Sequence, residues 1–236
     1  LDPFMGGGTS LVEASRFGAE TVGYDLNPVA WFVTKKELEA GQTDPEKLQE
    51  AFEQVKADVA DEITQYYRTP CPNADHAHGG GHDADVMYNF WVKELDCVSC
   101  GHTVPLFKDY RVAKGRYEND DKYNVLCPDC GAVTLVDDWQ AESSCNECSH
   151  EWIPKDGNVS RGGYYNCPEC GQKESITDGI AEQGKPEMRM YAVEYYCTNC
   201  DGEAESKSEY IGYKRAEPAD KNLFAEAERT WETRTD

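Results

Sequence analysis

Long apolar runs and basic side chains are both scarce in this sequence. No apolar run approaches the roughly 20 residues that a membrane-spanning helix needs, so we expect no membrane partner. Lys and Arg number only 23 against 45 Asp and Glu, which gives a formal net charge of −22. Electrostatic binding of nucleic acid requires a basic surface that displaces counterions. The composition therefore argues against simple electrostatic binding as the mode of action.

The acidic residues are spread along the whole chain rather than gathered in a tail. Such a distribution is typical of proteins from halophilic organisms, in which molar salt screens the bulk charge. A short basic segment with Lys108, Arg111, Lys114 and Arg116 could still contact phosphate, although a solvated hairpin is the simpler interpretation.

A dinucleotide-binding fingerprint is also missing, although a glycine-rich turn is present. That fingerprint spaces its glycines as G-x-G-x-x-G, whereas here three consecutive glycines lie within Asp2-Pro3-Phe4-Met5-Gly6-Gly7-Gly8-Thr9-Ser10. Glycines let the backbone approach a ligand closely, and a helix that begins after the turn presents free N–H groups to it. We expect this helix to run from about Thr9 to Phe17, with Thr9 or Ser10 as its N-cap.

A carboxylate follows this turn at the end of the next apolar run. Residues 20–26 predict a short buried strand, and Asp25 lies near its end, 17 residues after Gly8. A carboxylate at the tip of the second strand of a βαβ unit commonly accepts hydrogen bonds from ribose hydroxyls. Asn27-Pro28 predicts the start of another helix. The turn and the carboxylate together predict an α/β fold, a partial Rossmann-like unit, that binds a nucleotide-type cofactor.

Ten of the 11 cysteines form five C-x-x-C pairs, far more than chance placement would produce. The pairs are Cys97/Cys100, Cys127/Cys130, Cys145/Cys148, Cys167/Cys170 and Cys197/Cys200. Two such turns supply four thiolates to a tetrahedral structural zinc, and a closed site of this kind has no open position for chemistry. A disulfide framework is disfavoured because no secretory signal is present, so we expect a cytoplasmic protein. Iron–sulfur binding remains an alternative, but these knuckles suit zinc better.

The simplest pairing of these knuckles joins neighbours along the chain. It places Cys97/Cys100 with Cys127/Cys130, and Cys145/Cys148 with Cys167/Cys170. The Cys197/Cys200 pair then lacks a partner knuckle. It could complete a metal site with other ligands, or it could replace one of the pairs in the two sites above. The candidate ligands for it are Cys71, His76, His78 and His82. A flexible loop with solvated histidines is the simpler interpretation of the His-rich stretch.

Composition divides the chain into three parts. Residues 1–70 are α/β in character and include a helix over 44–68, with an apolar face formed by Leu48, Phe52, Val55, Val59, Ile63 and Tyr66. Residues 71–215 have the short aromatic and β-branched runs of zinc ribbons, which depend on metal because each has little core. The expected strand positions are Val92, Val104, Leu106, Phe107, Val133, Leu135, Val136, Tyr191, Val193, Tyr195 and Tyr196. Residues 216–236 contain a last helix over 220–232, with Leu223, Phe224, Ala227 and Trp231 on its inner side.

The first motif, Asp2 to Thr9, resembles the cofactor motif of S-adenosylmethionine-dependent amino-methyltransferases that act on DNA, and residues 23–28 resemble their second motif. Together with the knuckles, and with segments 90–107 and 190–193, they resemble the zinc-ribbon-containing adenine-specific DNA methylases of restriction–modification systems. The resemblance implies S-adenosylmethionine and zinc as cofactors and DNA as partner. It also implies cofactor-binding roles for six residues. The methionine part of the cofactor would be lined by Asp2, Phe4, Gly6 and Gly8. Asp25 would hold the ribose, and Asn27 would lie near the adenine.

The chain departs from this family in lacking the Asp/Asn-Pro-Pro-Tyr/Phe loop, which binds the target amine and stacks on a flipped base. No Pro-Pro dipeptide occurs in the sequence, so no catalytic residue is assigned. We expect a fragment, or one piece of a split enzyme whose companion polypeptide carries the loop, and little activity from this chain alone. The alternatives are a non-catalytic zinc-ribbon module that binds protein or nucleic acid, with a vestigial cofactor turn, and a methyltransferase for RNA or a small molecule.

Overall fold

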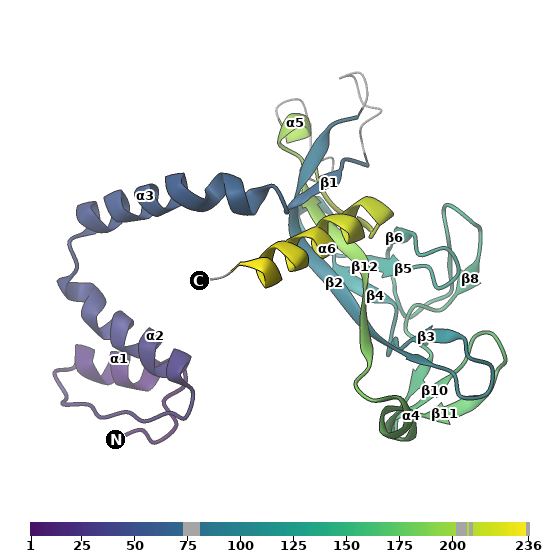
Figure 1. Ribbon diagram of the computed structural model, residues 1–236, viewed down its shortest axis with the longest axis horizontal. Coiled ribbons are helices and arrows are strands. Elements are labelled where there is room, and N and C mark those ends of the chain that lie inside the picture. The colour runs from purple at the N-terminus through teal and green to yellow at the C-terminus, as the bar shows by residue number, and fades with distance from the viewer. Residues whose placement is uncertain (73–80, 202–206, 208–209, 235–236) are drawn as a thin grey trace. The chain divides into compact units, whose positions relative to one another are not determined.

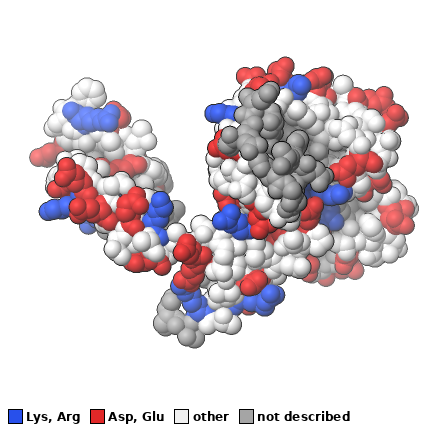
Figure 2. Space-filling view, turned by 90° about the horizontal axis from the view of Figure 1, so that it is seen from above, with Lys and Arg blue, Asp and Glu red and all other residues white. Residues whose placement is uncertain are grey.

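The computed structural model describes residues 1–72, 81–201, 207 and 210–234, and it divides into two compact units, Leu1–Glu62 and Ile63–Asp236. Figure 1 shows the helices of the first unit and the sheets of the second. Acidic side chains are spread over the surface that Figure 2 displays, with basic side chains interspersed among them. Among the described residues, no helix combines the length and apolarity needed to cross a bilayer.

The first unit is mostly helical. Its elements are α1 (Thr9–Arg16), α2 (Pro28–Glu39), the short 3-10 helix η1 (Ala40–Gln42) and α3 (Pro45–Thr64), whose last turn extends beyond the unit. The expected helices after the glycine turn, after Asn27 and after Asp44 are therefore confirmed. The Asn27 side chain accepts a hydrogen bond from the Val29 N–H (2.9 Å) and caps α2, with Pro28 in its first turn.

The strand expected over residues 20–26 is wrong in its extent. Only one parallel bridge forms, between Asp2 and Gly23. The Asp2 N–H donates to the Val22 carbonyl (2.9 Å) and the Tyr24 N–H donates to the Asp2 carbonyl (2.9 Å). The ladder stops there because the Phe4 N–H, the next donor in the parallel register, donates to the Asp2 carboxylate (3.0 Å) instead, and the Tyr24 carbonyl accepts from the Met5 N–H (3.0 Å). A strand forms only where a partner pairs with it, and residues 2–5 are too short to pair with the whole of residues 20–26.

Neither Thr9 nor Ser10 caps α1, which corrects the sequence prediction. The N-cap is Gly8, which has a left-handed backbone (φ 79°) and no side chain to donate or accept. The Ser10 hydroxyl instead donates to the Asp2 carboxylate. The left-handed turn at Gly8 directs the chain into the helix in place of a side-chain cap.

The helix α3 forms, but it ends at Thr64 rather than at residue 68, so Tyr66 lies beyond it, and its apolar face is not buried. The Asp44 carboxylate accepts from the Glu46 N–H (3.0 Å) at its start. Its apolar side chains are 36–60% exposed, and the helix has no buried residue: these side chains are Leu48, Phe52, Val55, Val59 and Ile63. The periodicity therefore predicted the helix correctly, but it did not predict burial against a core.

The second unit is organised around an antiparallel sheet of five strands. Four of them run in the order β1 (Arg68–Pro70), β2 (Asp83–Asp96), β12 (Glu187–Tyr196) and β13 (Ile211–Arg215), and β3 (Thr103–Pro105) pairs with the end of β2. The long β2–β12 ladder carries two irregularities in register. Val86, Met190 and Val193 form its core with Trp91 and Phe224.

Three small sheets are inserted between β3 and β12. They are β4 (Arg111–Lys114) with β5 (Tyr123–Leu126) and β6 (Val133–Val136); β7 (Ser143–Ser144) with β8 (Glu151–Trp152); and β9 (Val159–Ser160) with β10 (Tyr164–Asn166) and β11 (Lys173–Ser175). Of the short helices, η2 (Tyr117–Asn119) lies between β4 and β5, α4 (Ile176–Gln183) connects β11 to β12, and α5 (Thr198–Asp201) follows β12. Leu106 and Phe107 follow β3 rather than lying in a strand, and the remaining expected strand positions are confirmed.

The last helix, α6 (Pro218–Thr233), packs on the main sheet through part of its expected inner side. Leu223, Phe224 and Ala227 are half-buried, and the Phe224 ring contacts the Trp91 ring edge to face at 4.7 Å. Trp231 is 73% exposed, so its expected place on the inner side is wrong. Trp231 lies two turns beyond Phe224, on the same side of the helix. At this end of the helix the side chain is left exposed rather than packed.

Candidate metal centres and cofactor turn

The cysteine knuckles are formed by backbone hydrogen bonds. After each of three pairs, a left-handed glycine donates its N–H to the carbonyl of the first cysteine at 2.7–3.0 Å; the glycines are Gly101, Gly131 and Gly171. Ser149 takes the same position after Cys148, with φ 60°. A left-handed conformation is costly for a residue with a Cβ, so the knuckle geometry imposes it there. Each turn directs two sulfurs toward the same point.

Two groups of four thiols result, and they correct the expected pairing of neighbours. One group contains Cys97, Cys100, Cys167 and Cys170, and the other contains Cys127, Cys130, Cys145 and Cys148. The closest sulfur pairs lie 3.6 and 3.7 Å apart in the first group and 3.6 Å apart in the second. Along the chain, the second group lies between the two cysteine pairs of the first group, so the first group is called the outer group. The 97–100 knuckle lies at the end of the β2–β3 hairpin and the 167–170 knuckle lies at the end of the β10–β11 hairpin, and these two hairpin ends meet.

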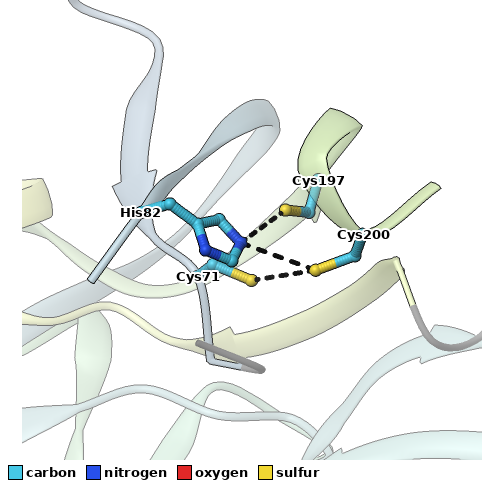
Figure 3. A group of neighbouring side chains, drawn as sticks. All are labelled: Cys71, His82, Cys197 and Cys200. Atoms are coloured by element: carbon cyan, nitrogen blue, oxygen red, sulfur yellow. Dashed lines mark hydrogen bonds between the residues drawn. The ribbon is translucent and has the colours of Figure 1, made fainter. Parts of the chain in front are cut away.

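A third group joins the remaining knuckle to the residue that follows β1 and the residue that precedes β2. Figure 3 shows Cys71, His82, Cys197 and Cys200 converging. The His82 Nε2 lies 3.1 Å from the Cys197 sulfur and 3.5 Å from the Cys200 sulfur, and the Cys71 and Cys200 sulfurs are 3.9 Å apart. Of the candidate ligands, both Cys71 and His82 contribute, whereas His76 and His78 lie outside the described residues.

The β1–β2 hairpin explains how Cys71 and His82 meet. Pro70 pairs with Asp83 in the antiparallel register, so the next residue outward on each strand is Cys71 and His82. The Cys71 N–H donates to the His82 carbonyl (3.0 Å). Recognising β1 and its register would have identified this pair from sequence, but a strand of three residues gives almost no periodic signal.

The distances in all three groups suit a tetrahedral zinc. With Zn–S bonds of about 2.3 Å, tetrahedral sulfurs lie ~3.8 Å apart, and the closest sulfur pairs are separated by 3.6–3.9 Å. Within each group all four ligand atoms lie within 4.8 Å of one another. Burial raises the pKa of Cys97 and of Cys200 to about 12. Thiols this close cannot all become thiolates unless a cation sits between them, so the donor set fits a metal ion.

One carboxylate ties the two knuckles of the outer group together. Glu174 on β11 accepts hydrogen bonds from the Val98 N–H (2.9 Å), the Ser99 N–H (3.0 Å) and the Tyr165 hydroxyl (2.8 Å). Burial opposes ionisation of Glu174, but these donors outweigh it and lower its pKa to about 2. Tyr165 is fully buried. Sequence reasoning missed Glu174, since no local pattern marks an acid that contacts a knuckle 75 residues away.

The cofactor turn brings the two sequence motifs of the first unit into contact. The Gly6 N–H donates to Asp25 Oδ2 (2.9 Å), and the Asn27 N–H donates to Asp25 Oδ1 (2.8 Å). The hydrogen bond from Asn27, followed by that from Gly6, lowers the pKa of Asp25. The carboxylate is therefore held ionised, with lone pairs left to accept from hydroxyl groups. Asp2 is held in the same way by the Ser10 hydroxyl and the Phe4 N–H, which lower its pKa.

Close packing explains two glycines of this unit. A Cβ on Gly8 would lie 2.5 Å from the side chain of Thr34, and one on Gly23 would lie 2.3 Å from Leu11 Cδ1. Gly8 therefore lets α2 approach the turn, and the Thr34 hydroxyl donates to the Gly6 carbonyl (3.3 Å). The structure brings Asp2, Gly6, Asp25 and Asn27 together, while the Phe4 side chain is 84% exposed.

Comparison with known proteins gives one relationship that bears on this geometry. The chain is 35% identical over 98 residues to the Type II methyltransferase M.MvaI of Kocuria varians. The matched segment is 42% of this chain but only 20% of the relative, so the chain corresponds to a small part of that protein. No model of a known protein family and no solved structure matches the chain. The match supports a relationship to methyltransferases, and the thiol groups could hold metal.

Proposed function

We propose that this chain is the cofactor-binding and zinc-ribbon portion of a DNA adenine-N6 methyltransferase. The observation that carries the proposal is the contact of the Asp25 carboxylate with the Gly6 N–H. It joins the glycine turn and the acidic residue of the second motif in a chain that is similar to a methyltransferase. A generic α/β turn does not require that pairing.

S-adenosylmethionine, when bound, supplies the activated methyl group. In the proposed site Asp25 accepts hydrogen bonds from the ribose hydroxyls, and its lowered pKa keeps it an acceptor at neutral pH. Gly6 and Gly8 allow the backbone to approach the methionine part, beside Asp2 and Phe4. Asn27 lies two residues after Asp25 and would lie near the adenine.

The zinc ions are proposed to be structural. Each of the three groups offers four protein ligands, so a tetrahedral ion would have no open position for a substrate. Ten of the ligands are the cysteines of the five knuckles, and Cys71 and His82 complete the third site. The metals would hold the small sheets in place beside the main sheet.

Binding of the target amine is proposed to require another segment. The sequence contains no Pro-Pro dipeptide, so the loop that accepts the adenine amine and stacks on the flipped base would come from a companion polypeptide or from a further part of the protein. This chain by itself would bind cofactor without transferring methyl groups. DNA is the proposed substrate of the complete enzyme.

Calorimetric titration of the zinc-loaded chain with S-adenosylmethionine at high salt tests the cofactor site. We expect saturable binding that is lost in Asp25→Asn, because the amide removes an acceptor and the negative charge while preserving shape. Glu20→Gln is the matched control, since Glu20 is exposed and the change removes the same charge. Equal affinity in the two variants, or no binding by the unmodified chain, would contradict the proposal. In the latter case a zinc-ribbon binding module with a vestigial turn becomes the better description.

A further inference from the structure

A pocket of about 620 Å³ in the second unit is lined by ten residues, of which four are basic and two are acidic. Its basic side chains are Lys108, Arg111, Lys155 and Arg161, and its acidic ones are Asp109 and Asp156. Trp139 lines the same pocket. In a chain with nearly twice as many acidic as basic residues, four cations around one pocket are an unusual local excess.

The backbone around this pocket is fixed by hydrogen bonds between segments far apart in sequence. The Tyr110 N–H donates to the Pro154 carbonyl (2.7 Å) and the Val159 N–H donates to the Phe107 carbonyl (2.9 Å). At Gly157 a Cβ would lie 2.2 Å from the Phe107 carbonyl oxygen, so the two segments touch there. The four cations are therefore displayed from positions that the fold holds together.

These cations are not neutralised by neighbouring carboxylates. Within the part of the chain that the structure describes, no ion pair joins an acid to any of the four. Elsewhere in the unit, Arg116, Arg189 and Arg215 each pair with a glutamate at 2.9–3.5 Å. Four exposed and unpaired cations beside one another repel, and a bound anion would remove that cost.

The remaining polar contacts of the pocket leave its cations available. The Arg111 guanidinium lies over the Trp139 ring at 4.4 Å from the centroid, which holds the side chain without occupying its N–H donors. The Lys155 Nζ contacts the Gln140 side-chain oxygen at 2.9 Å. Of the two acids, Asp109 accepts a hydrogen bond from the backbone N–H of Arg111 (3.2 Å), and Asp156 is exposed.

We propose that this pocket binds the phosphodiester backbone of DNA. A guanidinium fork suits phosphate oxygens, which it can bind through two parallel N–H groups. Contacts of this kind position a protein on DNA without reading sequence. They also place DNA binding on a local patch, in spite of the net charge of −22. The inference rests on the proposed function only for the choice of DNA as the polyanion.

Fluorescence anisotropy with a labelled DNA duplex, read over a series of salt concentrations without S-adenosylmethionine, tests this surface. The test variant is Arg111→Gln with Arg161→Gln. Its matched control is Lys185→Gln with Arg229→Gln, two exposed cations outside the pocket, so both variants lose two positive charges. Zinc content and circular dichroism verify that each variant is folded.

We expect the test variant to bind at least tenfold more weakly at low salt. The slope of log affinity against log salt should flatten by about 2, since each lost phosphate contact removes about 0.9. The control should keep the slope of the unmodified chain. Equal losses in both variants, unchanged binding in the test variant, absence of binding by the unmodified chain, or preference for duplex RNA would each overturn the proposal. Because cofactor is absent, failure here is distinct from failure of the cofactor site.

Discussion

Residues 1–62 bury only two apolar side chains, Met5 and Leu11, whereas the second unit buries apolar side chains around each of its three thiol groups. Three of the five buried clusters of the second unit each contain at least two cysteines of a single group. The first unit leaves Phe4, Phe17 and Leu26 more than 80% exposed. The first unit therefore has neither a large core nor, among its described residues, a group of side chains that could hold a metal ion, whereas the second unit has modest cores and three such groups.

The comparison shows how small sheets are stabilised when apolar area is limited. Strands of two to four residues cannot bury enough surface to offset the conformational entropy that folding costs. Ligands that converge on a metal add free energy that does not depend on area. In the first unit, backbone hydrogen bonds to Asp25 and Asp2 organise the turn without creating a core.

Removal of metal should have the largest effect, and it should unfold parts of the second unit while leaving the first unit folded. We expect three zinc ions per chain by elemental analysis, and a chelator should unfold the small sheets, because each structural zinc contributes on the order of 10–16 kcal/mol at neutral pH. Amide resonances of residues 1–62 should shift little. If those resonances collapse together with the second unit, the two units do not differ in the way described above.

The third metal site tests whether the donor set, rather than local packing, holds the β1–β2 hairpin to α5. His82→Ala should lower the zinc content from three to two and destabilise the second unit by several kcal/mol. His82→Cys should keep three zinc ions, because thiolate is also a zinc ligand. Thermal melts with metal analysis measure both effects. A content of three in the alanine variant would show that His82 is not a ligand.

Alanine substitutions at two neighbouring glycines test whether close packing between the turn and α2 stabilises the first unit. Gly8→Ala should destabilise it by about 1–3 kcal/mol, because φ is 79° and the new Cβ would meet Thr34 at 2.5 Å. Gly7→Ala is the control, since nothing lies within 4 Å of its Cβ position and its φ is not left-handed. Hydrogen exchange of α1 and α2 measures the difference. Similar protection in both variants would mean that close α2 packing is unimportant.

The smallest expected effect is the acid response of the cofactor turn. Because the folded pKa of Asp25 is lowered, its stabilisation is present above the unfolded value of about 3.9 and is lost as pH falls through the folded value. An NMR titration of the Gly6 and Asn27 amides should therefore show a transition below pH ~3.9. In Asp25→Asn that transition should vanish, and its persistence would assign it to another acid such as Asp2.

Local patterns in the sequence predicted many elements correctly. The Asn27-Pro28 start signal predicted α2 and helical periodicity predicted α3, since those signals act within one or two turns. The C-x-x-C spacing predicted the knuckles, because the turn that closes each one is local. The extent of the strand over residues 20–26 and the inner place of Trp231 were not predicted correctly, because both depend on partners elsewhere in the fold.

The sequence by itself determined which residues can bind metal and which turn can approach a cofactor, because residue type and short spacing decide both. Only the tertiary structure decided which knuckles share a site, that Cys71 and His82 complete the third, and that Glu174 braces the outer group. It also decided that Lys108, Arg111, Lys155 and Arg161 surround one pocket. These outcomes follow from strand register and chain crossings, which bring together residues whose separation in sequence carries no periodic signal.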